Sequence, residues 1–187
     1  MSALLRPATE SDLSAINDIY NYYVHHSTCT YQEVSETMAD RHKWFQQHGG
    51  RYPVIVAEFG GRVTGWGALS PFHPRSAFRM TVENSVYVHR DQHGQGVGSR
   101  LLEDLIARAR ALEYRAIVAA VDSGQLASIA LHSKFQFVKV GHLPQVGLKF
   151  GRWLDMLYLE LRLEAATQSL TAGLAKPTEE KRKGDRT

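Results

Sequence analysis

The chain has 187 residues, of which 43% are hydrophobic and 22% charged, and its formal net charge is +3 at pH 7. This length and composition are typical of one globular domain with a sizeable core. The small charge excess does not indicate a nucleic-acid partner, and no apolar run reaches the ~20 residues of a membrane span. The single cysteine, Cys29, excludes an internal disulfide and a cysteine-rich metal site. Because the first residues lack the apolar segment of a signal peptide, we expect a cytoplasmic enzyme or binding domain without a bound metal.

The first half of the chain predicts a short strand, two helices and a β-hairpin. Apolar spacing and turn residues place them at Leu4–Leu5, Thr9–Val24, Ser35–Gln47, and Val54–Ala57 with Val63–Leu69, the hairpin turning at Gly60–Gly61. In the second helix, Met38, Trp44 and Phe45 are expected to face the core.

The second half predicts strands and helices in alternation. They are a strand at Thr81–His89, a helix at Leu101–Leu112, a strand at Ala116–Val121, a helix at Leu126–Phe135, and strands at Phe137–Val140 and Met156–Leu161. Residues 164–187 lack aromatic side chains and end in mixed charges. We therefore expect a single domain at 1–163, followed by a disordered tail at 164–187.

Three alternating glycines separate a predicted strand from the amphipathic helix that follows. Gly94, Gly96 and Gly98 let the backbone turn tightly, and the helix start adds unpaired N–H groups and the positive end of its dipole. This arrangement is typical of a phosphate site, although a glycine turn can also be a plain connection. Ser99 and Arg100 do not fit a P-loop, which needs Lys-Ser/Thr there, and Ser99 replaces the last glycine of the dinucleotide fingerprint.

The segment His93–Gly98 resembles the coenzyme-binding motif of the GNAT acetyltransferases, Gln/Arg-x-x-Gly-x-Gly/Ala, with His93 in place of Gln or Arg. The order of predicted elements matches that fold over about Leu4–Leu163. Longer segments resemble the phosphinothricin and methionine sulfone acetyltransferase branch, namely Ile19–Asn21, Thr81–Val88, Ala127–His132 and Val146–Asp155. Two positions depart from the branch, since Gln125 replaces an Asn and Gln136 replaces a Gly.

The resemblance implies an α/β fold with a mixed, mostly antiparallel sheet, about four flanking helices and a homodimer. It also implies that acetyl-CoA is the co-substrate and that the acceptor is the α-amine of a small amino-acid analogue. Methionine sulfone, methionine sulfoximine and phosphinothricin are the expected analogues. Phe150 stands where phosphinothricin-specific members have His, which favours the first two. Two alternatives remain open: acetylation of protein N-termini or a polyamine, and a CoA-binding module without turnover.

The resemblance also assigns site residues. Glu83 would accept the amine proton and His132 would protonate the leaving thiolate, whereas an exposed strand glutamate and a structural histidine are the plainer interpretations. Coenzyme contacts are expected at Val86, Tyr87, Val88, His93, Gly94, Gln95, Gly96, Val97, Gly98, Ser99 and Gln125. Substrate contacts are expected at Tyr31, His73, Arg75, Arg79, Glu83, Asn84 and Ser85, the arginines binding a carboxylate.

Overall fold

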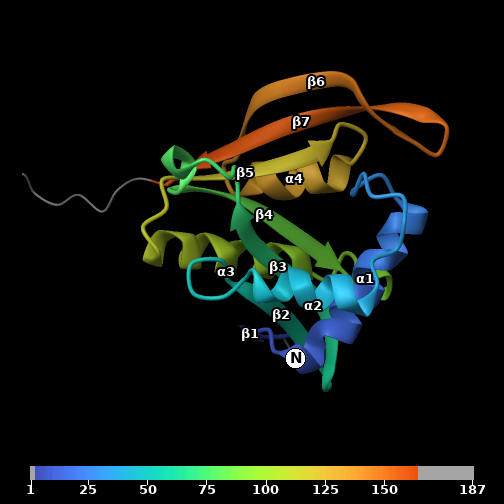
Figure 1. The fold of residues 1–187 in the computed structure, drawn as a ribbon, viewed down its shortest axis with the longest axis vertical. Coiled ribbons are helices and arrows are strands. Elements are labelled where there is room, and N and C mark those ends of the chain that lie inside the picture. Colours follow the sequence, from blue (N-terminus) through green and yellow to red (C-terminus); the bar gives the residue numbers. More distant parts are fainter. Residues whose placement is uncertain (1–2, 164–187) are drawn as a thin grey trace, which may run out of the picture.

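The computed structural model describes residues 3–163, so the expected tail at 164–187 lies outside the described residues. The order of elements agrees with the prediction (Figure 1). The helices and strands are β1 (Leu4–Pro7), α1 (Leu13–His26), α2 (Met38–Gln46), β2 (Val54–Phe59), β3 (Arg62–Pro71), β4 (Thr81–Val88), α3 (Val97–Ala111), β5 (Ala116–Asp122), α4 (Leu126–Lys134), β6 (Val138–Lys149) and β7 (Arg152–Arg162). Among residues 3–163, none of these helices is both long enough and apolar enough to cross a membrane.

All seven strands form one sheet in the order β1-β2-β3-β4-β5-β7-β6. Neighbouring strands run antiparallel except for β4 and β5, which are parallel. These two central strands pair only over Thr81–Glu83, opposite Ala116–Val118. Beyond Glu83 the two strands no longer pair, which opens the middle of the sheet. This opening positions the candidate site.

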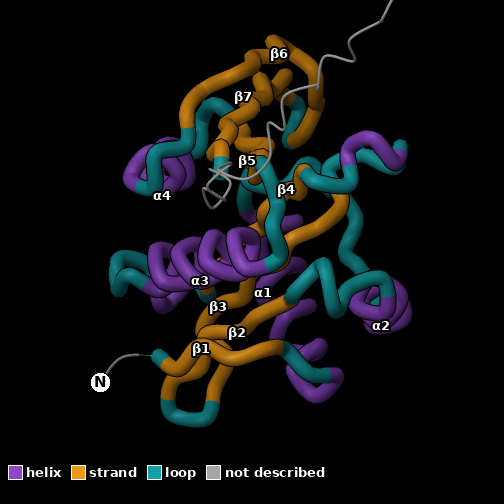
Figure 2. Tube along the Cα trace, turned by 90° about the vertical axis from the view of Figure 1, so that its left-hand side faces the viewer, coloured by secondary structure: helices purple, strands orange, loops and turns teal. Residues whose placement is uncertain are grey.

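Helices cover both faces of the sheet, with α3 and α4 on one side and α1 and α2 on the other (Figure 2). Leu101, Leu102 and Leu105 of α3 are fully buried in the larger of two hydrophobic clusters. Glycine favours the close approach of α3 to β3, because a Cβ atom at Gly65 would lie only 3.1 Å from Val97 Cγ1 and from Leu101 Cδ1 at the start of α3. This packing holds the start of α3, and therefore the glycine turn, beside the opening in the sheet.

The expectation that Met38 faces inward is wrong, since this residue is 39% exposed. Arg41 takes the buried position in α2 instead. Its guanidinium lies 4.7 Å from the centre of the Tyr20 ring and 4.8 Å from that of Trp44, and it pairs with Glu36 at 2.5 Å. Stacking on aromatic rings and the ion pair make burial of this cation possible.

The last two strands are much longer than predicted. The sequence predicted strands at Phe137–Val140 and Met156–Leu161, but β6 runs for 12 residues and β7 for 11. Pro144 lies within β6, and this is possible because β6 is the edge strand, where a residue without an N–H is tolerated. The register shifts between Lys139 and Gly141 and between Leu143 and Gly147, so irregular pairing hides the strand pattern.

Candidate active site

The glycine turn between β4 and α3 lines a cavity of about 350 Å³, which we call the outer cavity. Gly94 and Gly96 have φ angles of 74° and 77°, which residues with side chains rarely adopt. The first bond of α3 runs from the Arg100 N–H to the Gly96 carbonyl at 3.1 Å, so the amides before Arg100 have no acceptor within the helix. The lining residues are Val88, Gln92, His93, Gly94, Gly96, Val97, Gly98, Ser99 and Leu131. Such amides suit a phosphate group.

His93, the departure from the motif, contacts Tyr23 on α1. The imidazole Nε2 lies 2.6 Å from the Tyr23 hydroxyl, and the two rings stack with centres 6.2 Å apart. The same hydroxyl donates its proton to the carbonyl oxygen of Val88, and burial raises the pKa of Tyr23. Since that proton is used, Nε2 of His93 must carry its own proton and donate it. The sequence did not predict a role for Tyr23, because no local pattern links α1 to the glycine turn.

Two further cavities continue from the glycine turn into the opening between β4 and β5. The middle cavity has a volume of about 160 Å³ and the inner cavity about 270 Å³. The middle cavity shares with the outer one Val88, His93, Gly98 and Leu131, and with the inner one Cys29, Val86, Tyr87, Ser128 and His132. The shared linings make one path from the glycine turn to the centre of the sheet.

The inner cavity lies where the central strands diverge. Side chains from both faces of β4 line it there, because β4 no longer pairs with β5 beyond Glu83. Its lining residues come from the loop after α1, β4, β5, α4 and β7, and they are Cys29, Thr30, Tyr31, Glu83, Asn84, Ser85, Val86, Tyr87, Ala119, Ala120, Val121, Asp122, Ser128, His132 and Met156. Four of the predicted substrate contacts, Tyr31, Glu83, Asn84 and Ser85, therefore meet in one cavity.

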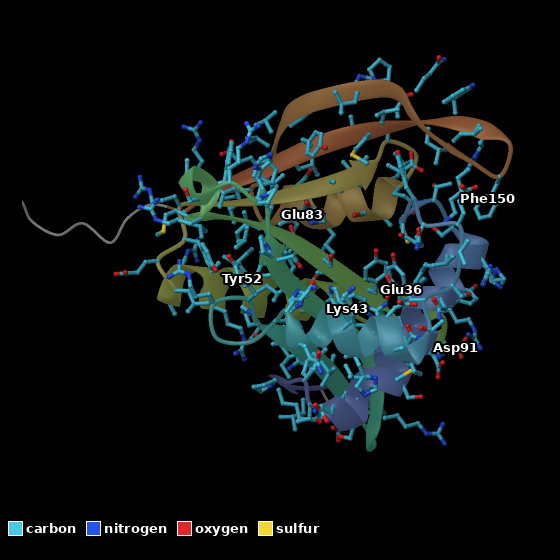
Figure 3. All side chains as sticks on the ribbon, in the orientation of Figure 1. Glu36, Lys43, Tyr52, Glu83, Asp91 and Phe150 are labelled. Atoms are coloured by element: carbon cyan, nitrogen blue, oxygen red, sulfur yellow. The ribbon has the colours of Figure 1, made fainter. Side chains whose placement is uncertain are left out.

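Glu83 presents an unpaired carboxylate in this cavity (Figure 3). It is half-buried, and within residues 3–163 no hydrogen-bond donor or cation is paired with it. Burial raises the pKa of the Glu83 carboxyl above its ordinary value. A carboxylate with a raised pKa and no internal partner can accept a proton from a bound reactant.

His132 is buried at the boundary of the middle and inner cavities. Its Nδ1 lies 2.8 Å from the carbonyl oxygen of Ser128, and its Nε2 lies 3.0 Å from Nδ2 of Asn84. The imidazole ring also packs edge-to-face on the Phe137 ring, and the two ring centres are 5.0 Å apart. Burial lowers the pKa of His132, so the neutral ring is favoured. The predicted general acid thus has both nitrogens engaged within the protein.

The loop at residues 27–31, which follows α1, is held over the inner cavity by buried polar contacts. Thr28 donates a hydrogen bond to Asp122, and it also accepts one from Gln125 Nε2 at 2.9 Å. The buried Lys149 of β6 donates to the carbonyl oxygens of Ser27 at 2.8 Å and Thr30 at 2.7 Å. Gln125 therefore uses its side-chain amide on this loop, and its expected contact with the coenzyme stays a prediction.

Several other predicted residues do not line any of the three cavities. Arg75 and Arg79 lie in the exposed connection between β3 and β4, and His73 there accepts a hydrogen bond from the Arg75 backbone at 3.2 Å. The Gln95 side chain donates to the Asp91 carbonyl at 3.3 Å. Phe150 is 55% exposed at the turn between β6 and β7, away from Glu83 (Figure 3). The carboxylate-binding role of the two arginines stays a prediction.

Known proteins are similar to this chain in sequence and in architecture. The sequence profile of the acetyltransferase (GNAT) family matches residues 16–137. A methionine sulfoximine/methionine sulfone acetyltransferase of Pseudomonas paraeruginosa is 44% identical over 166 residues, which cover 88% of this chain and 96% of that protein. A phosphinothricin N-acetyltransferase of Alcaligenes faecalis is 39% identical over 168 residues, covering 89% of this chain and 85% of that protein.

A solved structure has the same fold and contains the coenzyme. It is a GNAT-superfamily phosphinothricin acetyltransferase of Sinorhizobium meliloti in complex with acetyl-CoA, 35% identical to this chain, with a TM-score of 0.86. The match covers 96% of this chain and 95% of that one.

Proposed function

This chain belongs to the GNAT family of acetyl-CoA-dependent acetyltransferases, and we propose that it acetylates the α-amine of a small amino-acid analogue. The observation that carries the proposal is the path from the glycine turn, past His132, to the unpaired carboxylate of Glu83. A co-substrate bound along this path would hold its pyrophosphate at the turn and its thioester near the boundary of the middle and inner cavities. The amine would then lie beside Glu83.

In the proposed reaction, Glu83 accepts a proton from the amine, directly or through water. The amine nitrogen attacks the thioester carbonyl carbon and forms a C–N bond. The nitrogen then loses the extra proton that it carries after the attack, the C–S bond breaks, and the leaving coenzyme thiolate takes up a proton. A free α-amine has a pKa of roughly 8 and is largely protonated at neutral pH, so a nearby base increases the reactive fraction.

The size and polarity of the inner cavity support a small polar substrate. Its volume of about 270 Å³ is at the lower end for small-molecule sites. Tyr31 adds a buried hydroxyl that has no partner within residues 3–163, and burial raises its pKa to about 12. A hydroxyl that stays protonated can donate a hydrogen bond to a sulfone, sulfoximine or phosphinate oxygen. The relatives named for such substrates agree with this choice.

We also propose that the protein forms a homodimer through the β6–β7 hairpin. The edge strand β6 exposes an apolar row that includes Val138, Val140, Val146 and Leu148, and Trp153 on β7 is 61% exposed. Exposed apolar patches and unpaired strand edges are unfavourable in a monomer. Light scattering should give twice the chain mass for the wild type and a monomer for Trp153→Glu, and a monomeric wild type would overturn this proposal.

The release of free thiol from acetyl-CoA, measured with a panel of amines, tests the proposed activity. The panel should contain methionine sulfone, methionine sulfoximine, phosphinothricin, a polyamine and a peptide with a free N-terminus. We expect the highest kcat/KM with one of the three amino-acid analogues. A preference for the peptide or the polyamine would support that alternative instead, and coenzyme binding without thiol release would identify a non-catalytic module.

A further inference from the structure

The hydrogen bonds of His132 fix which of its nitrogens carries the proton. The Ser128 carbonyl can only accept, so Nδ1 at 2.8 Å must be the donor. In the neutral ring Nε2 is then an acceptor, and the Asn84 amide must turn its NH₂ group toward it at 3.0 Å. The carbonyl oxygen of Ser128 thus determines, through the imidazole of His132, how the Asn84 amide is oriented.

This orientation leaves one atom of Asn84 without a partner. Asn84 is only 7% exposed, and its Oδ1 is buried. This oxygen accepts no hydrogen bond from any of residues 3–163. Leaving a buried acceptor unpaired is unfavourable, and such atoms in native proteins call for an explanation. Asn84 lines the inner cavity, so a bound reactant with an N–H group could supply the missing donor.

We infer that Asn84 Oδ1 accepts a hydrogen bond from the substrate amine and that His132 is a positioning residue acting through Asn84. The inference rests on the proposed acetylation of an amine in this cavity. Asn84 lines the inner cavity together with Glu83 but does not line the middle cavity, which leads to the glycine turn. The substrate amine is therefore a better donor for Oδ1 than an amide of the coenzyme.

The positions of Glu83 and Asn84 would also orient the amine for its attack on the thioester. Glu83 and Asn84 are neighbours on β4, so their side chains leave the strand on opposite faces, and both reach the inner cavity. A neutral primary amine has two N–H groups and one lone pair. With one N–H directed to Glu83 and the other to Asn84, the lone pair is left to point at the thioester carbonyl. Orienting a nucleophile in this way contributes to the rate beyond simple binding.

The test uses four single variants and one double variant, each measured with both co-substrates varied. Asn84→Leu removes Oδ1 at similar volume, and we expect kcat/KM for the amine to fall about tenfold to a hundredfold, as for a lost buried hydrogen-bond partner. KM for acetyl-CoA should stay unchanged. A rise in the acetyl-CoA KM alone would overturn the assignment to the amine. If Asn84→Leu does not fold, Asn84→Ala makes the same comparison.

A double-mutant cycle separates positioning from acid catalysis. His132→Leu should lower kcat/KM in the wild type but have almost no further effect in the Asn84→Leu background. His132→Gln offers an amide oxygen to Asn84 Nδ2 and should recover much of the activity, although glutamine cannot donate a proton as an acid. Additive losses without recovery in His132→Gln would overturn the inference and assign His132 as the acid. A wild type that acetylates no amine would instead refute the proposed function.

Discussion

Gly147 of β6 lies directly against the ring of Tyr31. A Cβ atom on Gly147 would come within 2.6 Å of both Cδ2 and Cε2 of that ring. Tyr31 lines the inner cavity, whereas none of the residues of β6 does. The shape of the candidate substrate site therefore depends on a strand that does not contact it.

Gly147→Ala should disturb the substrate end of the site through Tyr31. The added methyl group forces the ring to move, and we expect KM for the amine to rise several-fold while KM for acetyl-CoA stays the same. Gly141→Ala on the same strand is the matched control, because its Cβ would meet Tyr158 at an ordinary 3.5 Å. Equal effects of the two variants on amine KM would contradict the role of this contact.

Lys149→Met should destabilise the protein and loosen the 27–31 loop. The substitution keeps the aliphatic stem but removes two charge-assisted donors from the carbonyls of Ser27 and Thr30. We expect the free energy of unfolding to fall by about 2–4 kcal/mol, measured by urea titration. Lys139→Met, at an exposed position of β6, should leave it nearly unchanged. If both variants unfold at the same urea concentration, Lys149 does not hold the loop.

Gly96→Val should weaken acetyl-CoA binding in calorimetry. Valine is strained at a φ of 77°, and its side chain obstructs the backbone amides of the glycine turn. Gly61→Val is a close control, since Gly61 has a φ of 76° and similarly open surroundings in the β2–β3 turn. Both variants should lose a similar amount of stability, and only Gly96→Val should lose affinity. Unchanged affinity in Gly96→Val would remove the turn from the coenzyme site.

Local patterns account for most of the fold prediction. The glycines at Gly94 and Gly96 and the apolar face of α3 mark a strand–turn–helix unit that the structure confirms. The sequence underestimated the length of β6, where Pro144 and two register shifts interrupt the alternation. It also placed Met38 in the core of α2, where Arg41 takes the buried position. In both places tertiary contacts override local preference.

The site was predicted less completely, because its parts come from distant segments. Glu83, Asn84 and Tyr31 do meet in the inner cavity. The contacts that hold them could not be read from the sequence: Lys149 and the loop at 27–31 are about 120 residues apart. Equally, nothing in the local sequence shows that Arg75 and Arg79 remain exposed outside the cavity lining.

The raised pKa of Glu83 predicts that Glu83→Gln stabilises the protein at alkaline pH. A carboxyl whose pKa is higher in the folded than in the unfolded state favours folding while it is protonated. It lowers the stability of the folded state as the pH rises through the folded pKa and the buried group ionises. Glutamine has no charge to bury, so its melting temperature should exceed that of the wild type at pH 8. The difference should shrink as the pH falls toward the ordinary glutamate value of 4.5. A variant less stable than the wild type at pH 8 would indicate a structural carboxylate.

Turnover of Glu83→Gln as a function of pH tests the assignment of the base most directly. General-base catalysis contributes roughly 10²–10⁴-fold, so kcat at pH 7 should fall by that factor while acetyl-CoA affinity barely changes. The deficit should narrow as the pH rises, because more of the amine is then already neutral. Glu160→Gln, a half-buried glutamate of β7, provides the control. Near-normal turnover at pH 7 in a folded Glu83→Gln protein, or a deficit that is the same at every pH, would contradict the account.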